Sequence, residues 1–241
     1  MFIHYFRLWF QTFSVENLLS RLSVTTSLTQ AIENVDFVIE AIPENLDLKR
    51  QFFAELDKLA PREAIFVSNT SSLRLSDMSS GLSGSRKERF GGMHFFCPVP
   101  VMELVEMIRI PETSDRTFDT MMGVCGRLGK TPIVCKDTTC FIVNRLIMAF
   151  AMEAVRMAER GDASPEDIDK AIRLGMGYKI GPFALADFIG LDVFQAVNDS
   201  LHKALPDNPV FEPSVSVARM IKEGNLGRKT GKGFFDYKSK I

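Results

Sequence analysis

The sequence lacks a charge excess, a paired cysteine motif and a long apolar run. Its 241 residues carry 29 lysines and arginines against 30 aspartates and glutamates, so the net charge of −1 does not indicate a nucleic-acid partner. The four cysteines, at 97, 125, 135 and 140, form no CxxC pair and have no histidine at zinc-ligand spacing. We therefore expect free thiols in a reducing compartment and no metal site. No run of about 20 apolar residues is present, so we expect no helical membrane span.

The composition is that of a globular protein with a sizeable core. Apolar residues make up 46% of the chain and charged residues 24%. The first thirteen residues differ from the rest because they are aromatic-rich, with one arginine and no acid. They fit a mitochondrial presequence poorly, since such segments usually hold more arginine and serine, and we assign them no role.

The first half of the chain alternates short β-prone runs with amphipathic stretches, which favours a mainly parallel sheet with helices on its faces. Residues 46–59 and 114–128 have apolar residues at helical spacing. The expected strands are residues 22–26, 36–42, 64–68, 92–96, 104–110 and 131–135.

From residue 137 onward the pattern predicts helices only, at 141–159, 164–175, 183–204 and 215–222. Gly161 is well placed to end the first of them, and Ser164 followed by Pro165 is a good start for the second. We therefore expect two domains, residues 1–136 and 137–241, in an α/β fold followed by an all-α fold.

His94 is the candidate for chemistry among the three histidines. It ends an expected strand, and the prolines at 98 and 100 force the chain to turn directly after it. If residues 104–110 fold back on residues 92–96, the turn is centred near Pro100 and His94 faces Glu106. Opposed residues on antiparallel strands have Cβ atoms about 4.5–5.5 Å apart. A carboxylate at that distance orients an imidazole, which can then act as a base.

Simpler interpretations exist for the histidines. A surface His–Glu pair would show the same pattern in the sequence as a catalytic one. His202 lies toward the end of an expected helix, where a positive side chain suits the helix dipole. His4 lies in the atypical first segment.

Six segments, in order, resemble the 3-hydroxyacyl-CoA dehydrogenase family over roughly residues 15–238. Together they are far more specific than any one of them. They are FVIEAIPEN (37–45), SNTSS (68–72), MHFFCPVP (93–100), FIVNR (141–145), GPFALAD (181–187) and GRKTGKGFFDY (227–237).

The resemblance implies an NAD-binding Rossmann-type domain followed by a helical domain that forms a homodimer. It implies oxidation of an L-3-hydroxyacyl-CoA to the 3-ketoacyl-CoA in fatty-acid β-oxidation, with NAD as cofactor and acyl-CoA as substrate. The location it implies is the mitochondrial matrix, with cytoplasmic and peroxisomal locations as alternatives.

The same resemblance assigns roles to individual residues. It implies that His94 is the catalytic base, Glu106 the carboxylate that orients it, and Ser71 and Asn144 the contacts of the substrate hydroxyl and the reacting oxygen. Neutral donors such as these can hold an alkoxide-like oxygen without neutralising the base. Cofactor-binding positions by resemblance are Glu44, Lys49, Ser71, Cys97 and Lys229.

Each assignment has a structural alternative. Ser71 would also serve as a strand-exit cap, and Asn144 as a polar residue at a helix end. Glu44 and Lys49 would also fit a charged, solvated helix start. Lys229 would also fit a solvated glycine-rich turn.

The main departure from the family pattern is the phosphate-binding loop. Family members begin with a strand, a GxGxxG turn and a helix, whereas Gly81 is the first glycine here. We therefore expect an incomplete doubly wound sheet, in which the strand at residues 36–42 lacks a neighbour. The expected explanations are a truncated or alternatively spliced chain, an incomplete gene model, or a non-catalytic relative that binds acyl-CoA or dimerises.

Two smaller departures lie near the site. Cys97 stands where the family usually has an asparagine, and a thiol is a poor replacement for an amide that donates and accepts. Thr139 and Cys140 replace the usual Pro-Gly pair, and we expect a small shift of the hinge between the domains.

Overall fold

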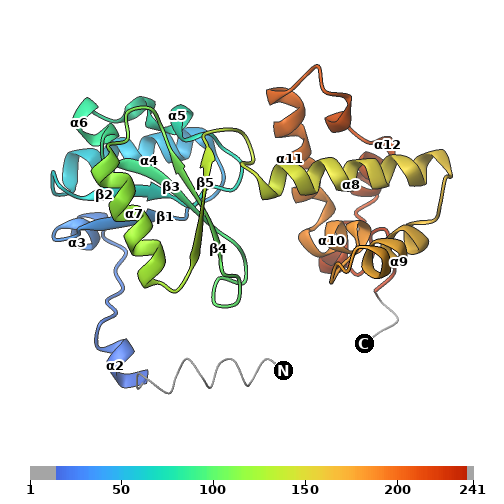
Figure 1. Cartoon of the computed structure of the whole chain (residues 1–241), viewed down its shortest axis with the longest axis horizontal. Helices are drawn as coiled ribbons and strands as arrows, with labels where there is room; N and C mark the ends of the chain where they lie inside the picture. Colours follow the sequence, from blue (N-terminus) through green and yellow to red (C-terminus); the bar gives the residue numbers. More distant parts are fainter. Residues whose placement is uncertain (1–14, 238–241) are drawn as a thin grey trace.

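The computed structural model describes residues 15–237, and Figure 1 shows them as a sheet-containing lobe and a helical lobe. Within these residues the strands form one five-stranded sheet in the order β1-β2-β3-β4-β5. Neighbouring strands are parallel except β3 and β4, which are antiparallel. The strands are β1 (Phe37–Glu40), β2 (Ile65–Ser68), β3 (Phe90–Phe95), β4 (Leu104–Arg109) and β5 (Thr131–Lys136). The mainly parallel sheet expected from the sequence is confirmed.

Helices flank this sheet in the first lobe, apart from α2, which lies away from it in Figure 1, and helices make up the second lobe. In the first lobe they are α2 (Val15–Leu19), α3 (Leu28–Ile32), α4 (Leu46–Leu59), α5 (Leu75–Met78), η1 (Ser79–Gly81), α6 (Gly84–Lys87) and α7 (Asp115–Arg127). In the second they are α8 (Val143–Arg160), α9 (Pro165–Gly175), α10 (Pro182–Ile189), α11 (Leu191–Ala204), η2 (Pro209–Phe211), α12 (Val215–Lys222) and η3 (Arg228–Thr230).

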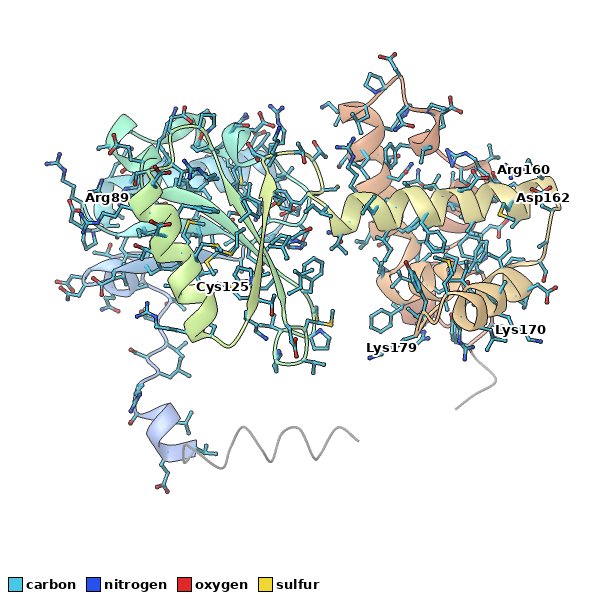
Figure 2. All side chains as sticks on the ribbon, viewed as in Figure 1. Arg89, Cys125, Arg160, Asp162, Lys170 and Lys179 are labelled. Atoms are coloured by element: carbon cyan, nitrogen blue, oxygen red, sulfur yellow. The ribbon has the colours of Figure 1, made fainter. Side chains whose placement is uncertain are left out.

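The sheet buries a different cluster on each face. Neighbouring strand residues point to opposite faces, so Phe66 joins one cluster and Val67 the other. Helices α4 and α5 supply the first cluster, with Phe53 among its members, and α7 supplies the second, with Cys125 among its members. Figure 2 shows Cys125 on α7 in the sheet lobe. Both faces of the central strands are therefore covered, as a doubly wound sheet requires.

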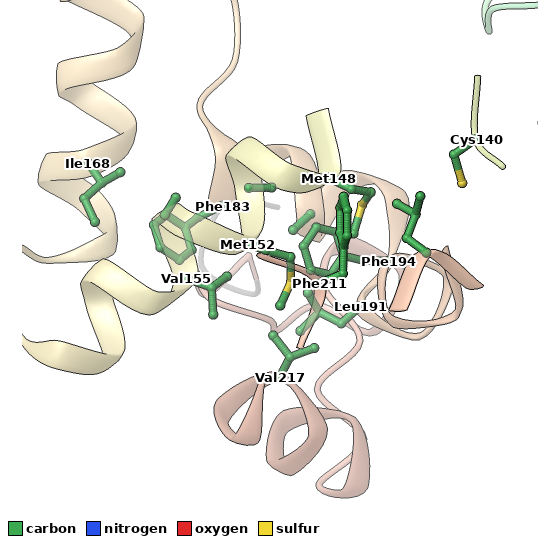
Figure 3. Close-up of a cluster of buried hydrophobic side chains, with 14 residues drawn as sticks. Cys140, Met148, Met152, Val155, Ile168, Phe183, Leu191, Phe194, Phe211 and Val217 are labelled. Carbon is green, nitrogen blue, oxygen red and sulfur yellow. The ribbon is translucent and has the colours of Figure 1, made fainter. Parts of the chain in front are cut away.

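The helical lobe has a separate core around α8. Met152 and Val155 of α8 pack with Phe183 and Phe194 from α10 and α11, as Figure 3 shows. The long helix ends as predicted at Gly161, which has φ +76. Ser164 accepts a hydrogen bond from the Asp167 amide and begins α9.

Three details of the sequence-based secondary structure are wrong. Residues 22–26, expected as a strand, contain none. The single helix expected at 183–204 is two helices, because Gly190 has φ +100 and ends α10 before α11 begins. The short helices between residues 75 and 87 were not predicted, since each is too short to show helical periodicity.

Strand β1 lies at the edge of the sheet. Among residues 15–237 it pairs with β2 alone, which agrees with the expected loss of a neighbour. Ile39 on this strand is 45% exposed. The aromatic-rich segment of residues 1–13 lies outside the described residues.

All four cysteines are free, Cys125 and Cys140 being buried. Across the part of the chain that the structure describes, no helix is long and apolar enough to cross a membrane.

Candidate active site

His94 and Glu106 face each other across β3 and β4, in the register predicted from the turn at Pro100. Nδ1 of His94 lies 2.7 Å from Oε2 of Glu106. The two residues are only 3% and 1% exposed. The hairpin therefore builds a buried imidazole–carboxylate pair at the carboxyl end of β3, the edge at which α/β sheets carry their sites.

The second oxygen of Glu106 binds the start of helix α8. Oε1 accepts hydrogen bonds from the backbone amides of Ile142 at 3.0 Å and Val143 at 2.9 Å. Burial disfavours the charged carboxylate, but the bonds from His94 and these amides outweigh it and hold the pKa of Glu106 below its usual value. Glu106 is therefore an ionised acceptor on both of its oxygens.

An ionised Glu106 decides which nitrogen of His94 carries the proton. A carboxylate can only accept, so Nδ1–H donates to it and Nε2 is left with a free lone pair. The rings of Phe96 and Phe141 lie beside the imidazole, with centroids 4.5 Å and 5.7 Å away. The result is a desolvated, oriented base whose reactive atom is Nε2.

Ser71 and Asn144 come together across the two lobes. Nδ2 of Asn144 donates to the backbone oxygen of Ser71 at 3.2 Å. Asn144 directly follows Val143, whose amide holds Glu106, so it stands next to the dyad along α8. The backbone amide of Cys140 donates to the Ser72 oxygen at 3.1 Å, which ties the same two segments a second time.

Glu44 organises the loop that carries Ser71. Its Oε1 accepts from the Thr70 hydroxyl at 2.6 Å and from the amides of Ser71 and Ser72 at 3.0 and 2.9 Å. Partial burial opposes its charge, but the Thr70 hydrogen bond and the nearby Lys49 ammonium hold the pKa of Glu44 below its usual value. Ser71 itself is exposed.

Lys49 is not a solvated helix-start charge. It is 1% exposed, and its Nζ lies 2.6 Å from Oε1 of Glu40, 3.1 Å from the Ile42 oxygen and 3.3 Å from Glu44. Glu40 was missed from the sequence, although an acid inside an apolar strand is a usable signal. Ser68 donates its hydroxyl to Oε2 of Glu40 at 2.5 Å and completes the buried set.

The two remaining predicted cofactor positions lie in different places. Cys97 is exposed and lies two residues beyond Phe95, the last residue of β3. Lys229 lies in the helical lobe, where Nζ pairs with Asp192 at 2.5 Å at the start of α11. Lys229 therefore bonds within the helical lobe and is not part of the hydrogen bonds that link His94 to Glu106 and Asn144 to Ser71.

Two family models match this chain along nearly all of the described residues. The model of the 3-hydroxyacyl-CoA dehydrogenase NAD binding domain matches residues 7–138, and that of the C-terminal domain matches residues 141–237. The chain belongs to the 3-hydroxyacyl-CoA dehydrogenase family. The family resemblance inferred from the six motifs is confirmed, and NAD is the cofactor of this family.

Relatives of the family are similar over most of the chain. A Mus musculus protein named hydroxyacyl-coenzyme A dehydrogenase, mitochondrial, is 49% identical over 93% of this chain and 71% of its own length. A probable 3-hydroxybutyryl-CoA dehydrogenase of Bacillus subtilis is 40% identical over 94% of this chain and 77% of its own. The crystal structure of (S)-3-hydroxybutyryl-CoA dehydrogenase from Ralstonia eutropha superposes with a TM-score of 0.87, at 40% identity, over 93% of this chain and 78% of that one.

Within residues 15–237, the groups that fit NAD lie at its reacting end. The dyad and the contact between Asn144 and Ser71 both lie at the start of α8, and they offer the base and the neutral donors that a hydroxyl substrate beside a nicotinamide requires. A glycine loop that could bring backbone amides to the pyrophosphate is not in the sequence, because Gly81 is its first glycine. The edge position of β1 agrees with this, since in the Rossmann order such a loop follows a strand that would pair beside it.

Proposed function

We propose that this protein oxidises the 3-hydroxyl group of an L-3-hydroxyacyl-CoA to a ketone with NAD, in fatty-acid β-oxidation. The observation that carries the proposal is the buried His94–Glu106 pair clamped to the start of α8, in a chain of this family. An imidazole with a fixed tautomer and a free Nε2 is the group that removal of a hydroxyl proton requires.

Each residue of the site has a separate role at the substrate hydroxyl. Nε2 of His94 takes the hydroxyl proton, and Glu106 stabilises the imidazolium that forms. Ser71 and Asn144 hold the substrate oxygen by neutral donors. NAD, when bound, supplies the acceptor for the hydride that leaves the same carbon.

The proposed cofactor residues act in different ways. Glu44 shapes the 70–72 loop from which Ser71 reaches the site. Lys49 supports that role through its ion pair with Glu44, because its own ammonium is buried. Cys97 is the exposed residue beyond His94 and is proposed to contact the cofactor from there, while Lys229 acts from the helical lobe.

We assign residues 1–136 to the NAD-binding domain and residues 137–241 to the helical domain. The separate hydrophobic cores of the two lobes support this division, apart from Phe141, which packs in the core of the sheet lobe. Homodimerisation through the helical domain is supported by large exposed apolar side chains on or beside α9 and α10: Leu174 at 75%, Met176 at 57%, Tyr178 at 47% and Phe188 at 64% exposure. Phe188→Glu should convert the dimer to a monomer in sedimentation equilibrium, and an unchanged mass would refute this interface.

The mitochondrial matrix is the proposed location. It is supported by mitochondrial names among relatives of Mus musculus and Homo sapiens at 49% and 47% identity. Fluorescent tagging of the C-terminus in cells, followed by co-localisation with a matrix marker, tests the location directly.

The activity is tested by mixing the purified chain with NADH and acetoacetyl-CoA and following nicotinamide absorbance. Turnover should be lost in His94→Gln and kept in His202→Gln, which changes a histidine of the helical lobe. Unchanged turnover in His94→Gln would refute the assigned base.

Titration with each ligand separates binding from turnover. The enzyme should bind both NADH and acetoacetyl-CoA, and binding of acetoacetyl-CoA with no binding of NADH at millimolar concentration would contradict the NAD-dependent activity.

A further inference from the structure

The backbone takes an unusual path just before helix α8. Cys140 has φ +62 and Phe141 has φ +50, and among residues 15–237 they are the only non-glycine residues with positive φ. A side chain with a Cβ atom disfavours this left-handed region, and two such residues in succession are rarer still. Strain of this kind persists only where the surrounding contacts hold it in place.

The contacts around the turn show what holds it. Cys140 is fully buried and its amide donates to the Ser72 oxygen at 3.1 Å. Phe141 is 2% exposed, belongs to the α4–α5 core and lies against the His94 ring. The turn is therefore fixed on one side by the Ser71–Ser72 loop and on the other by the core beneath the dyad.

The turn decides where the first amides of α8 point. The N-cap residue Ile142 offers no side-chain hydrogen bond to the helix, so these amides need another acceptor. Glu106 of β4 is that acceptor for Ile142 and Val143. A carboxylate from the sheet thus caps the helix while its other oxygen holds His94.

We propose that the Cys140–Phe141 turn is a positioning element for the His94–Glu106 pair. Its left-handed backbone aims the Ile142 and Val143 amides at Oε1 of Glu106 and so fixes the carboxylate that orients the imidazole. This positioning role rests on the proposed function of His94 as a base, but the placement of the Glu106 carboxylate against His94 can be measured without turnover.

The first test is the order of stability of two small substitutions. At Cys140, Cys140→Gly should melt at a higher temperature than Cys140→Ala, because glycine adopts positive φ without the Cβ penalty. The difference should be about 2–4 °C. Cys125 is the matched control, being equally buried but inside helix α7. There the order should invert, since glycine destabilises a helix relative to alanine. The same order at both sites would overturn the claim of a strained turn.

The second test disturbs the turn and observes the dyad. Cys140→Val places a β-branched side chain where positive φ is hardest to reach. The low-field proton resonance of the His94 Nδ1–H···Glu106 hydrogen bond should shift or broaden in this variant. It should be unchanged in Cys125→Val and retained in Cys140→Gly. An unchanged resonance in a folded Cys140→Val protein would refute the positioning role.

Kinetics supply an independent readout. Cys140→Val should lower kcat by about ten- to a hundredfold with little change in KM, because the base is misplaced and the substrate contacts are kept.

The pH dependence of kcat should change as well. The acid limb of the pH–kcat profile that is set by protonation of Glu106 should move to higher pH in Cys140→Val, because the two amides help to hold the pKa of Glu106 low. The titratable groups facing Glu106 are His94 on β3, Cys135 on β5 and Cys140 itself. A raised KM with unchanged kcat in Cys140→Val would contradict the positioning role. If the unmodified chain is inactive, the proposed function is refuted, and the resonance test alone decides the positioning role.

Discussion

Lys49 and Glu40 form a buried ion pair, with 2.6 Å between Nζ and Oε1 and side chains only 1% and 0% exposed. The pair joins helix α4 to the edge strand β1, where strand pairing exists on one side alone within residues 15–237. Both charges are further satisfied, Lys49 by the Ile42 oxygen and Glu40 by the Ser68 hydroxyl. Two buried charges are tolerated here because each is paired and hydrogen-bonded.

Removing one partner of this pair should destabilise the sheet lobe strongly. Lys49→Met leaves the Glu40 charge buried and unpaired, which costs about 3–5 kcal/mol in the free energy of unfolding. Urea denaturation measures the loss. Lys58→Met, on an exposed position of the same helix, should stay within about 0.5 kcal/mol of the wild type.

The double variant Glu40→Gln/Lys49→Met measures how far the stabilising effects of the two side chains depend on each other. Its glutamine side chain carries no charge but keeps an acceptor for the Ser68 hydroxyl, so the double variant should lose less than the sum of the two single variants. Additive losses would show that the two side chains do not depend on each other.

Glu106→Gln should abolish most of the activity while keeping the fold. The amide keeps the shape of the carboxylate but has no charge to stabilise an imidazolium, so we expect kcat to fall by about 10²–10⁴. Stopped-flow measurement of NADH oxidation with acetoacetyl-CoA checks the loss. Glu103→Gln, an exposed acid just before β4, is the control and should retain full turnover.

Stability at low pH should depend on Asp57. Partial burial opposes its charge, but the Arg86 guanidinium at 2.9 Å and the Ser83 amide at 2.8 Å hold the pKa of Asp57 below 3.8. A carboxyl with a lowered folded-state pKa stabilises the fold above its unfolded pKa, and this contribution is lost as pH falls through the folded value.

Asp57→Asn should therefore be less stable than the wild type by about 1.5–3 kcal/mol near pH 7. The gap should close as pH falls below 3.8, the ordinary value for aspartate. Urea unfolding at a series of pH values measures it. Asp119→Asn, an exposed position on α7, should follow the wild type throughout, and a gap for Asp57→Asn that is constant with pH would contradict the assignment.

Gly181 should not tolerate a side chain. A Cβ at this position would lie 2.3 Å from Cγ of Asp169, whose carboxylate binds the Phe183 and Ala184 amides at the start of α10. Gly181→Ala should cost about 1–3 kcal/mol by overpacking, measured by thermal unfolding. Gly175→Ala, which meets open space at the end of α9, is the matched control and should be neutral or stabilising.

The local sequence pattern was sufficient to predict much of the fold and the opposition of His94 and Glu106. The periodicity of residues 46–59 predicted α4, and the apolar runs predicted β1 to β5. His94 was matched to Glu106 because a turn centred near Pro100 places residues 94 and 106 at equal distances from it, and the structure has this register. Helix α5 escaped prediction because four residues carry too little periodicity.

The sequence by itself determined the hairpin that opposes His94 to Glu106 and the motifs that mark the family. The tertiary structure alone decided that Lys49 is buried, that Glu106 also caps α8, and that Asn144 reaches the Ser71 backbone. The reason is physical: strand register follows from local spacing, whereas these contacts join residues 36 and 73 positions apart, or depend on burial created when α4 packs against the sheet.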